Sequence, residues 1–173
     1  MRRSVYRAVA CLCSLVVLGG CVPPETGGWA ALRLSDNGDL RIVMSLCSGE
    51  NADSLSVFTQ GEANSAAWDA LAPIESRDDG PTEFTLFEAP PAWDVDEEGD
   101  LEPLVDGVLY GLSATTTGYD AAGGMTRPRR SGVDFSLDQL RQLGDGEVLV
   151  TTESFEGAVK SLEEFESDAE ATC

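Results

Sequence analysis

The sequence predicts a mainly β domain, folded as a β-sandwich or a partly closed barrel of about six or seven strands, with one or two short helices near its end. Two observations lead to this prediction. Short apolar alternations with a period of two recur along the chain, and turns containing glycine separate many of them. Helix-capping patterns that precede apolar residues at helical spacing occur near the end of the chain. Short strands at this spacing favour two packed sheets.

The clearest element is a β-hairpin between residues 29 and 47. Apolar residues alternate with polar ones on both sides of an Asp-Asn-Gly-Asp turn at residues 36–39. A two-residue turn would place the two apolar rows on opposite faces of the hairpin. A three-residue loop ending at Gly38 instead pairs Leu34 with Leu40, and glycine adopts the left-handed conformation that this loop needs. The pattern therefore favours the three-residue loop.

The remaining elements are shorter. Strands are predicted within residues 55–59, 84–86, 104–117, 133–137 and 148–152. Two helices follow from capping boxes, one formed by Ser136 and Gln139 and one by Ser161 and Glu164. The first helix is expected to end near Gly144. If Ser136 caps a helix, the strand before it must end there.

The beginning of the chain has the pattern of an export signal. Arg2, Arg3 and Arg7 precede an apolar stretch from Ala8 to Leu18, which at roughly 11 residues is too short to cross a bilayer. The next residues, Leu18-Gly19-Gly20-Cys21, resemble the lipobox of bacterial lipoproteins. The resemblance implies cleavage before Cys21 and diacylglycerol on its thiol. An ordinary signal peptide with a chance cysteine is the alternative.

These patterns divide the chain into three parts. Residues 1–20 are the predicted lipoprotein signal peptide, and residues 21–28, rich in proline and glycine, are a lipidated tether. Residues 29–173 form a single β-rich domain, which is long enough to bury a core. We expect the protein to be exported and lipid-anchored on the extracytoplasmic face of a membrane.

Five cysteines indicate a disulfide. Cys11 and Cys13 would leave with the signal peptide and Cys21 would carry lipid, so Cys47 and Cys173 remain as a pair in an oxidising compartment. A bridge between them would close nearly the whole domain, which the chain-entropy model values at about 4–5 kcal/mol. Two free thiols and an intermolecular bridge are the alternatives.

A resemblance to the immunoglobulin class makes an immunoglobulin-like β-sandwich the first choice of fold. It depends on Cys47 at a strand end and on Trp68 further along the chain. The chain departs from that class because its second cysteine does not follow at the usual Cys-Trp-Cys spacing. The likeness therefore concerns the fold and implies no function.

The charge restricts the partners. The chain carries 31 acidic and 11 basic residues, a formal net charge of −20. Loss of three arginines with the signal peptide would leave 8 − 31 = −23. Such a charge repels polyanions, so nucleic acid is not an expected partner, whereas a cationic partner or a divalent ion is compatible.

The residue inventory excludes several chemistries. The chain has no histidine, which removes Ser-His and Cys-His nucleophiles and histidine-ligated zinc. Its only lysine, Lys160, is adjacent to Ser161, and neighbouring helical residues do not face each other. We therefore expect no enzyme activity. Paired carboxylates acting as a hydrolase are an unfavoured alternative.

An acidic segment partly resembles a calcium loop of the EF-hand type. Asp94, Asp96, Glu98 and Asp100 occupy ligand offsets of such a loop. Val105 stands where the bidentate glutamate belongs, and nearby prolines argue against flanking helices. The hypotheses are a calcium ion that stabilises the β-domain and a solvated acidic turn that needs no cofactor.

A basic segment lies in the glycine-rich stretch of residues 119–132, which we interpret as a long loop. Arg127, Arg129 and Arg130 supply its charge and form the candidate binding loop. Together these features predict a non-enzymatic binding or structural module of the cell envelope, whose partner is an unidentified envelope protein or ligand. A calcium-stabilised adhesion or assembly domain is the main alternative.

Overall fold

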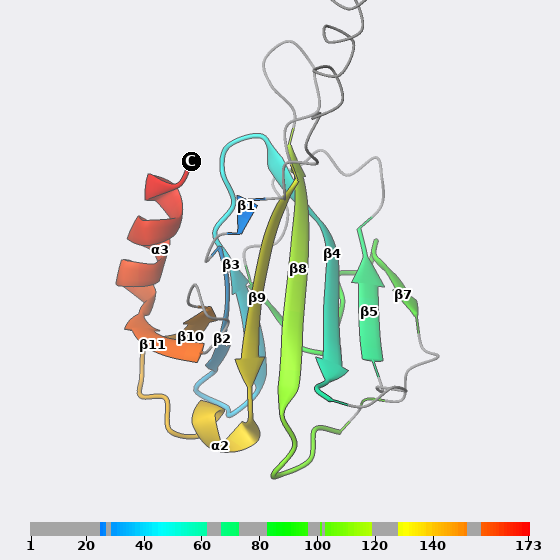
Figure 1. The fold of residues 1–173 in the computed structure, drawn as a ribbon, viewed down its shortest axis with the longest axis vertical. Helices are drawn as coiled ribbons and strands as arrows, with labels where there is room; N and C mark the ends of the chain where they lie inside the picture. The colour runs from blue at the N-terminus through cyan, green and yellow to red at the C-terminus, as the bar shows by residue number, and fades with distance from the viewer. Residues whose placement is uncertain are drawn as a thin grey trace, which may run out of the picture.

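The computed structural model describes residues 25–26, 29–61, 67–72, 83–96, 101, 103–118, 128–151 and 157–173. Within these ranges the chain is mainly β, with two sheets packed face to face and a helix on the outside of one of them (Figure 1). Among the described residues, no helix is both long and apolar enough to cross a bilayer.

The first sheet contains six strands in the order β1-β9-β8-β4-β5-β7. Neighbouring strands run antiparallel, except that β1 is parallel to β9. The strands are β1 Glu25–Thr26, β4 Glu50–Thr59, β5 Ala67–Leu71, β7 Asp94–Asp96, β8 Tyr110–Gly118 and β9 Arg129–Phe135.

The second sheet contains five antiparallel strands in the order β11-β10-β2-β3-β6. They are β2 Ala30–Leu34, β3 Leu40–Met44, β6 Glu83–Thr85, β10 Glu147–Thr151 and β11 Gly157–Ser161. Helix α2 (Leu137–Leu140) connects the sheets between β9 and β10, and α3 (Leu162–Ala171) follows β11. Within the described residues each sheet is open, with an edge strand on either side. The fold is therefore a β-sandwich and not a closed barrel.

Apolar side chains from both sheets form the main core. Each large aliphatic side chain removed from water stabilises the fold by about 1.5–3 kcal/mol. The second sheet also buries its outer face, because Phe165 of α3 packs against a cluster that includes Val43 and Val150. The large members of the main core include Leu32, Ile42, Leu55, Val57, Val133 and Phe135.

The predicted hairpin is confirmed in its register. Leu34 pairs with Leu40 across β2 and β3, and the Ser35 N–H donates to the Asp39 carbonyl at 2.9 Å, which leaves a three-residue loop. Gly38 has a φ of 83°, the left-handed conformation that the loop was expected to require.

Both predicted helix starts are confirmed. Ser136 and Gln139 form a complete capping box at α2, and the Ser161 hydroxyl accepts from the Glu164 N–H at the start of α3. Helix α2 ends at Leu140, one turn before the predicted stop at Gly144. The chain after it continues as turns, in which Leu143 donates to the Leu140 carbonyl.

Two features of the strand prediction are wrong. The described residues form eleven strands and not six or seven. The strands that the sequence did not predict are β1, β5, β7 and β11, which are short and show little apolar alternation. The strand predicted from residue 104 begins at Tyr110, since an Asp106-Gly107 turn precedes it and Gly107 has a φ of 78°. Part of the predicted tether, Glu25–Thr26, pairs with β9.

Candidate functional site: a disulfide beside a buried arginine

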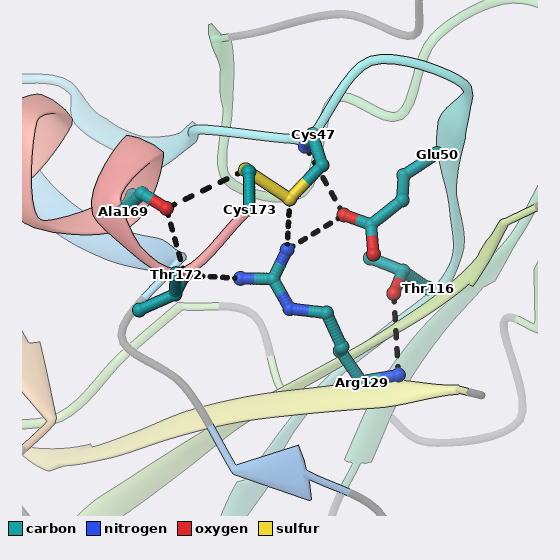
Figure 2. The surroundings of a disulfide bond; sticks show 7 residues. All are labelled: Cys47, Glu50, Thr116, Arg129, Ala169, Thr172 and Cys173. Atoms are coloured by element: carbon teal, nitrogen blue, oxygen red, sulfur yellow. Dashed lines mark hydrogen bonds and ion pairs between the residues drawn. A yellow bond between two sulfur atoms is a disulfide. The ribbon is translucent and has the colours of Figure 1, made fainter. Parts of the chain in front are cut away.

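The predicted disulfide between Cys47 and Cys173 is confirmed. It joins the segment between β3 and β4 to the residue that follows the C-cap of α3, across a sequence separation of 126 and a Cα–Cα distance of 5.4 Å (Figure 2). Because α3 packs on the outer face of the second sheet while Cys47 leads into the first, the bridge fastens the helix to both sheets.

Arg129 lies beside this disulfide and is only 7% exposed. One terminal nitrogen, Nη1, donates to Glu50 Oε2 at 2.7 Å and lies 2.7 Å from Cys47 Sγ. The other, Nη2, donates to Thr172 Oγ1 at 3.0 Å. The guanidinium therefore contacts β4, the disulfide and the end of α3 at once.

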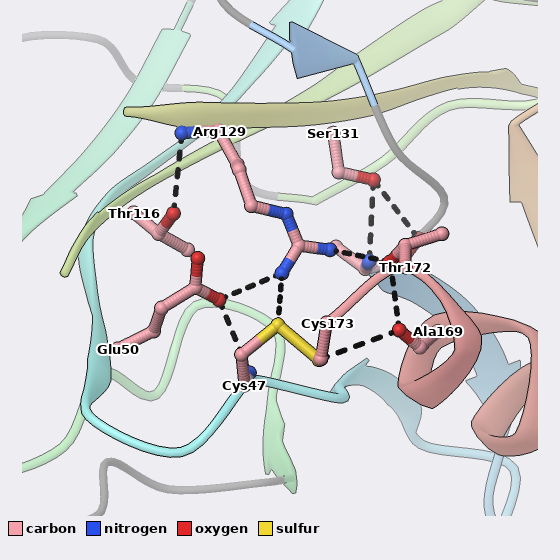
Figure 3. Close-up of polar contacts among 9 residues, drawn as sticks. Cys47, Glu50, Thr116, Arg129, Ser131, Ala169, Thr172 and Cys173 are labelled. Carbon is pink, nitrogen blue, oxygen red and sulfur yellow. Dashed lines mark hydrogen bonds and ion pairs between the residues drawn. A yellow bond between two sulfur atoms is a disulfide. The ribbon is translucent and has the colours of Figure 1, made fainter. Parts of the chain in front are cut away.

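The partners of Arg129 are themselves fixed by hydrogen bonds. Glu50 Oε2 also accepts from the Cys47 N–H at 3.1 Å, and Thr172 Oγ1 donates to the Ala169 carbonyl at 2.7 Å (Figure 3). The side chains of Arg129 and Glu50 are 9% and 11% exposed, so their ion pair is largely removed from water. Such a pair costs desolvation to form, and loss of either partner leaves a buried charge uncompensated.

The prediction that Arg129 and Arg130 lie in a loop is wrong, whereas a binding role for Arg130 stays a prediction. Both residues belong to β9, in which residues 129, 131, 133 and 135 point inward and Arg130 is exposed. The alternation of buried and exposed residues is not evident from the sequence, because Arg129 and Ser131 are polar. Each of these two buried side chains forms hydrogen bonds within the protein. Ser131 Oγ, for example, accepts from the Ala30 N–H at 3.2 Å and lies 3.4 Å from the Ala30 carbonyl. Arg127 lies outside the described residues.

The acidic segment is described only in part. Asp94 and Asp96 lie on β7, both exposed, and Asp96 stands opposite Asp69 on β5. Glu98 and Asp100 lie outside the described residues. Within the described part of the chain, no group of three or more acidic or cysteine side chains is arranged to hold a metal ion. Calcium binding by the whole segment stays a prediction, as does lipidation of Cys21, which also lies outside the described residues.

A small cavity of about 140 Å³ lies beneath α3. Apolar side chains such as Phe165 and Val150 line it, and the ion pair of Lys160 with Asp168, at 2.5 Å, stands at its margin. Its volume is below the roughly 300–1,000 Å³ typical of sites for drug-sized ligands. The cavity adjoins the disulfide region through Thr172, which lines it as well.

Asp53 lies where β4 bulges, between Ala52 and Ser54. Burial raises the pKa of its carboxyl, and hydrogen bonds from the side chain and backbone of Thr117 offset this only in part. The native state therefore binds more protons than the unfolded state between the two pKa values, and stability falls as the pH rises through them. This contribution to stability is present below the unfolded pKa and is lost above the native pKa.

We expect Asp53→Asn to raise the thermal midpoint at pH 7 by about 1–3 °C, because an amide keeps an oxygen acceptor for Thr117 without an ionised form to desolvate. The gain should disappear below about pH 4, where the aspartate is protonated. Thermal melts of the full chain at both pH values measure this. Asp145→Asn, at an exposed turn, is the control. An equal gain at both pH values would contradict the assigned cause.

Sequence reasoning missed Glu50, Thr116 and Thr172 as members of this cluster. Thr116 accepts from the Arg129 N–H at 3.3 Å, although threonine on a strand gives no sign of such a partner. Two features of the sequence could have indicated the cluster: the alternation of inward residues that begins at Arg129, and the two remaining cysteines, Cys47 and Cys173. No family model, curated protein or solved structure matches the chain, so the functional argument depends on its own sequence and structure.

Proposed function

We propose that this chain is a lipid-anchored extracytoplasmic lipoprotein that acts as a non-enzymatic binding or structural module of the cell envelope. The observation that carries the proposal is the sequence from Arg2 to Cys21: a basic start, a short apolar stretch, and the Leu-Gly-Gly-Cys tetrad. A diacylglycerol group supplies two acyl chains, and two membrane signals are what stable anchoring requires, since one chain binds only marginally.

The disulfide supports the extracytoplasmic location. Structural disulfides persist in oxidising compartments and are rare in the cytosol. The bridge between Cys47 and Cys173 closes most of the domain, as expected for an exported protein of this size. The same compartment is the one in which a lipobox is processed.

Two arginine side chains, which form hydrogen bonds within the protein itself, support a non-enzymatic role. Arg129, which the sequence offered as a surface contact, donates to the protein's own Glu50 and Thr172. Arg33 Nη2 likewise donates to both carboxylate oxygens of Glu83, at 2.8 Å each. These side chains are paired within the fold, and the chain contains no histidine for acid–base work.

Cys21→Ser is expected to abolish incorporation of a labelled fatty acid into the full chain expressed in bacteria and to reduce its detergent-phase partitioning by more than tenfold. The reason is that serine offers no thiol for diacylglycerol, and about 0.8 kcal/mol of membrane affinity is lost for each buried methylene. Detergent phase separation and gel autoradiography measure the two effects.

Cys13→Ser is the matched control, because it removes a nearby cysteine from the predicted signal peptide and should leave the fatty-acid label in place. Undiminished labelling of Cys21→Ser would contradict the anchor. Loss of label in both variants would instead show that export, and not the acceptor thiol, had been impaired.

A further inference from the structure

The two sulfur atoms of the disulfide lie in different electrostatic surroundings. Cys47 Sγ is 2.7 Å from Nη1 of the buried Arg129, and a neighbouring positive charge stabilises a cysteine as thiolate. Glu50 shares the same nitrogen and partly opposes this effect. If the bridge opens, the guanidinium of Arg129 is therefore positioned to stabilise a thiolate on Cys47.

Cys173 has the opposite surroundings. It follows the C-terminal end of α3, its N–H donates to the Glu170 carbonyl at 3.1 Å, and its Sγ lies 3.5 Å from the Ala169 carbonyl. The end of a helix carries a partial negative charge, and α3 has no basic residue in its last turn. A thiolate on Cys173 is thus disfavoured, yet the residue is exposed whereas Cys47 is half-buried.

We propose that the disulfide is a thiol-exchange site at which a small thiol becomes attached to Cys173. The thiolate of the incoming molecule attacks Cys173 Sγ and forms a new sulfur–sulfur bond, while the bond to Cys47 breaks. The electron pair of that bond passes to Cys47 Sγ, which leaves as a thiolate beside Arg129. The incoming thiol is oxidised to the mixed disulfide and Cys47 is reduced, so the step balances without another reactant.

Exchange also releases α3 from its covalent attachment. The helix Leu162–Ala171 carries five acidic residues. Without the bridge, noncovalent contacts alone hold it, among them the packing of Phe165, the ion pair of Lys160 with Asp168 and the hydrogen bond from Arg129 to Thr172. The outer face of the second sheet, which Phe165 covers, becomes accessible as the helix loosens. Opening at Cys173 therefore alters the surface of the domain as well as its covalent state.

The test maps where a thiol attaches. The full chain is treated with N-ethylmaleimide to block free thiols and exposed briefly to 2-mercaptoethanol, which is uncharged and so is not repelled by the acidic protein. Acid quenches the reaction, and mass spectrometry of peptic fragments counts adducts on each sulfur. We expect at least about a fivefold excess at Cys173 over Cys47, since the better leaving thiolate departs faster. An equal or inverted distribution would overturn the proposal, as would a folded protein that forms no adduct.

Glu50→Gln separates the electrostatic effect from simple weakening of the structure. It removes the carboxylate that opposes a Cys47 thiolate while keeping an oxygen that accepts from Arg129, so the excess at Cys173 should rise by about two- to fivefold. Weakening alone would let thiols reach both sulfurs and move the distribution toward equality, which would overturn the role given to charge. Glu83→Gln, which breaks the ion pair with Arg33 on the second sheet, should leave the distribution unchanged.

Discussion

Replacing Cys47 and Cys173 together with serine is expected to lower the free energy of unfolding by about 4–5 kcal/mol. The bridge spans a sequence separation of 126, so it removes a large loop-closure entropy from the unfolded chain. It also brings the end of α3 to Arg129, and α3 covers the outer face of the second sheet. Urea unfolding of the full chain, followed by tryptophan fluorescence, measures the loss.

The fully reduced wild-type protein should show the same loss, because reduction removes the same constraint without changing any side chain. Cys11→Ser/Cys13→Ser is the matched double variant and should unfold like the wild-type protein. A loss below about 1 kcal/mol in the Cys47 and Cys173 variant would show that the bridge constrains the unfolded chain far less than its loop length implies.

Local patterns predicted local structure well. The loop ending at Gly38 and the cap at Ser136 depend on a few neighbouring residues, whose preferences for φ and for hydrogen bonding are intrinsic. The disulfide was predictable for another reason: setting aside the cysteines of the predicted signal peptide and the predicted lipidation site left two candidates. In each case the sequence itself contained the constraint that the structure satisfies.

Structure that depends on pairing between residues far apart in the chain could not be predicted from the sequence. Strand β7 depends on its pairing with β5, and the two-residue β1 on its pairing with β9, so neither has a pattern of its own. The sequence predicts a loop at Arg129 because residues 119–132 are rich in glycine. The place of Arg129 in a strand follows from the pairing of β9 with β8. The burial of its side chain depends on Glu50 and Thr172, which are 79 and 43 residues away. The cluster around Arg129 could therefore be identified only from the folded structure, in which these distant residues are in contact.

Arg129→Met is expected to lower the free energy of unfolding by about 3–5 kcal/mol, the cost of leaving a buried carboxylate without its partner. Glu50 is 11% exposed in its side chain and loses the guanidinium that neutralises it, while Thr172 loses a donor. Urea unfolding with the disulfide intact measures the effect. Arg141→Met is the matched control, because Arg141 pairs with Asp106 in solvent, at 56% and 65% exposure, where an ion pair contributes less than about 1 kcal/mol.

The double variant Arg129→Met/Glu50→Leu should recover most of that loss, because apolar side chains of similar size often replace a buried ion pair at little net cost. Recovery would mean that the pair contributes little net stability to the fold. The single variant Glu50→Leu completes the comparison. If the double variant instead loses the sum of the two single losses, each side chain stabilises the fold through separate contacts, Arg129 with Thr172 and Glu50 with the Cys47 N–H. A retained ion pair with no net stability is what a thiolate-stabilising arginine predicts, since its charge is needed only when the bridge opens.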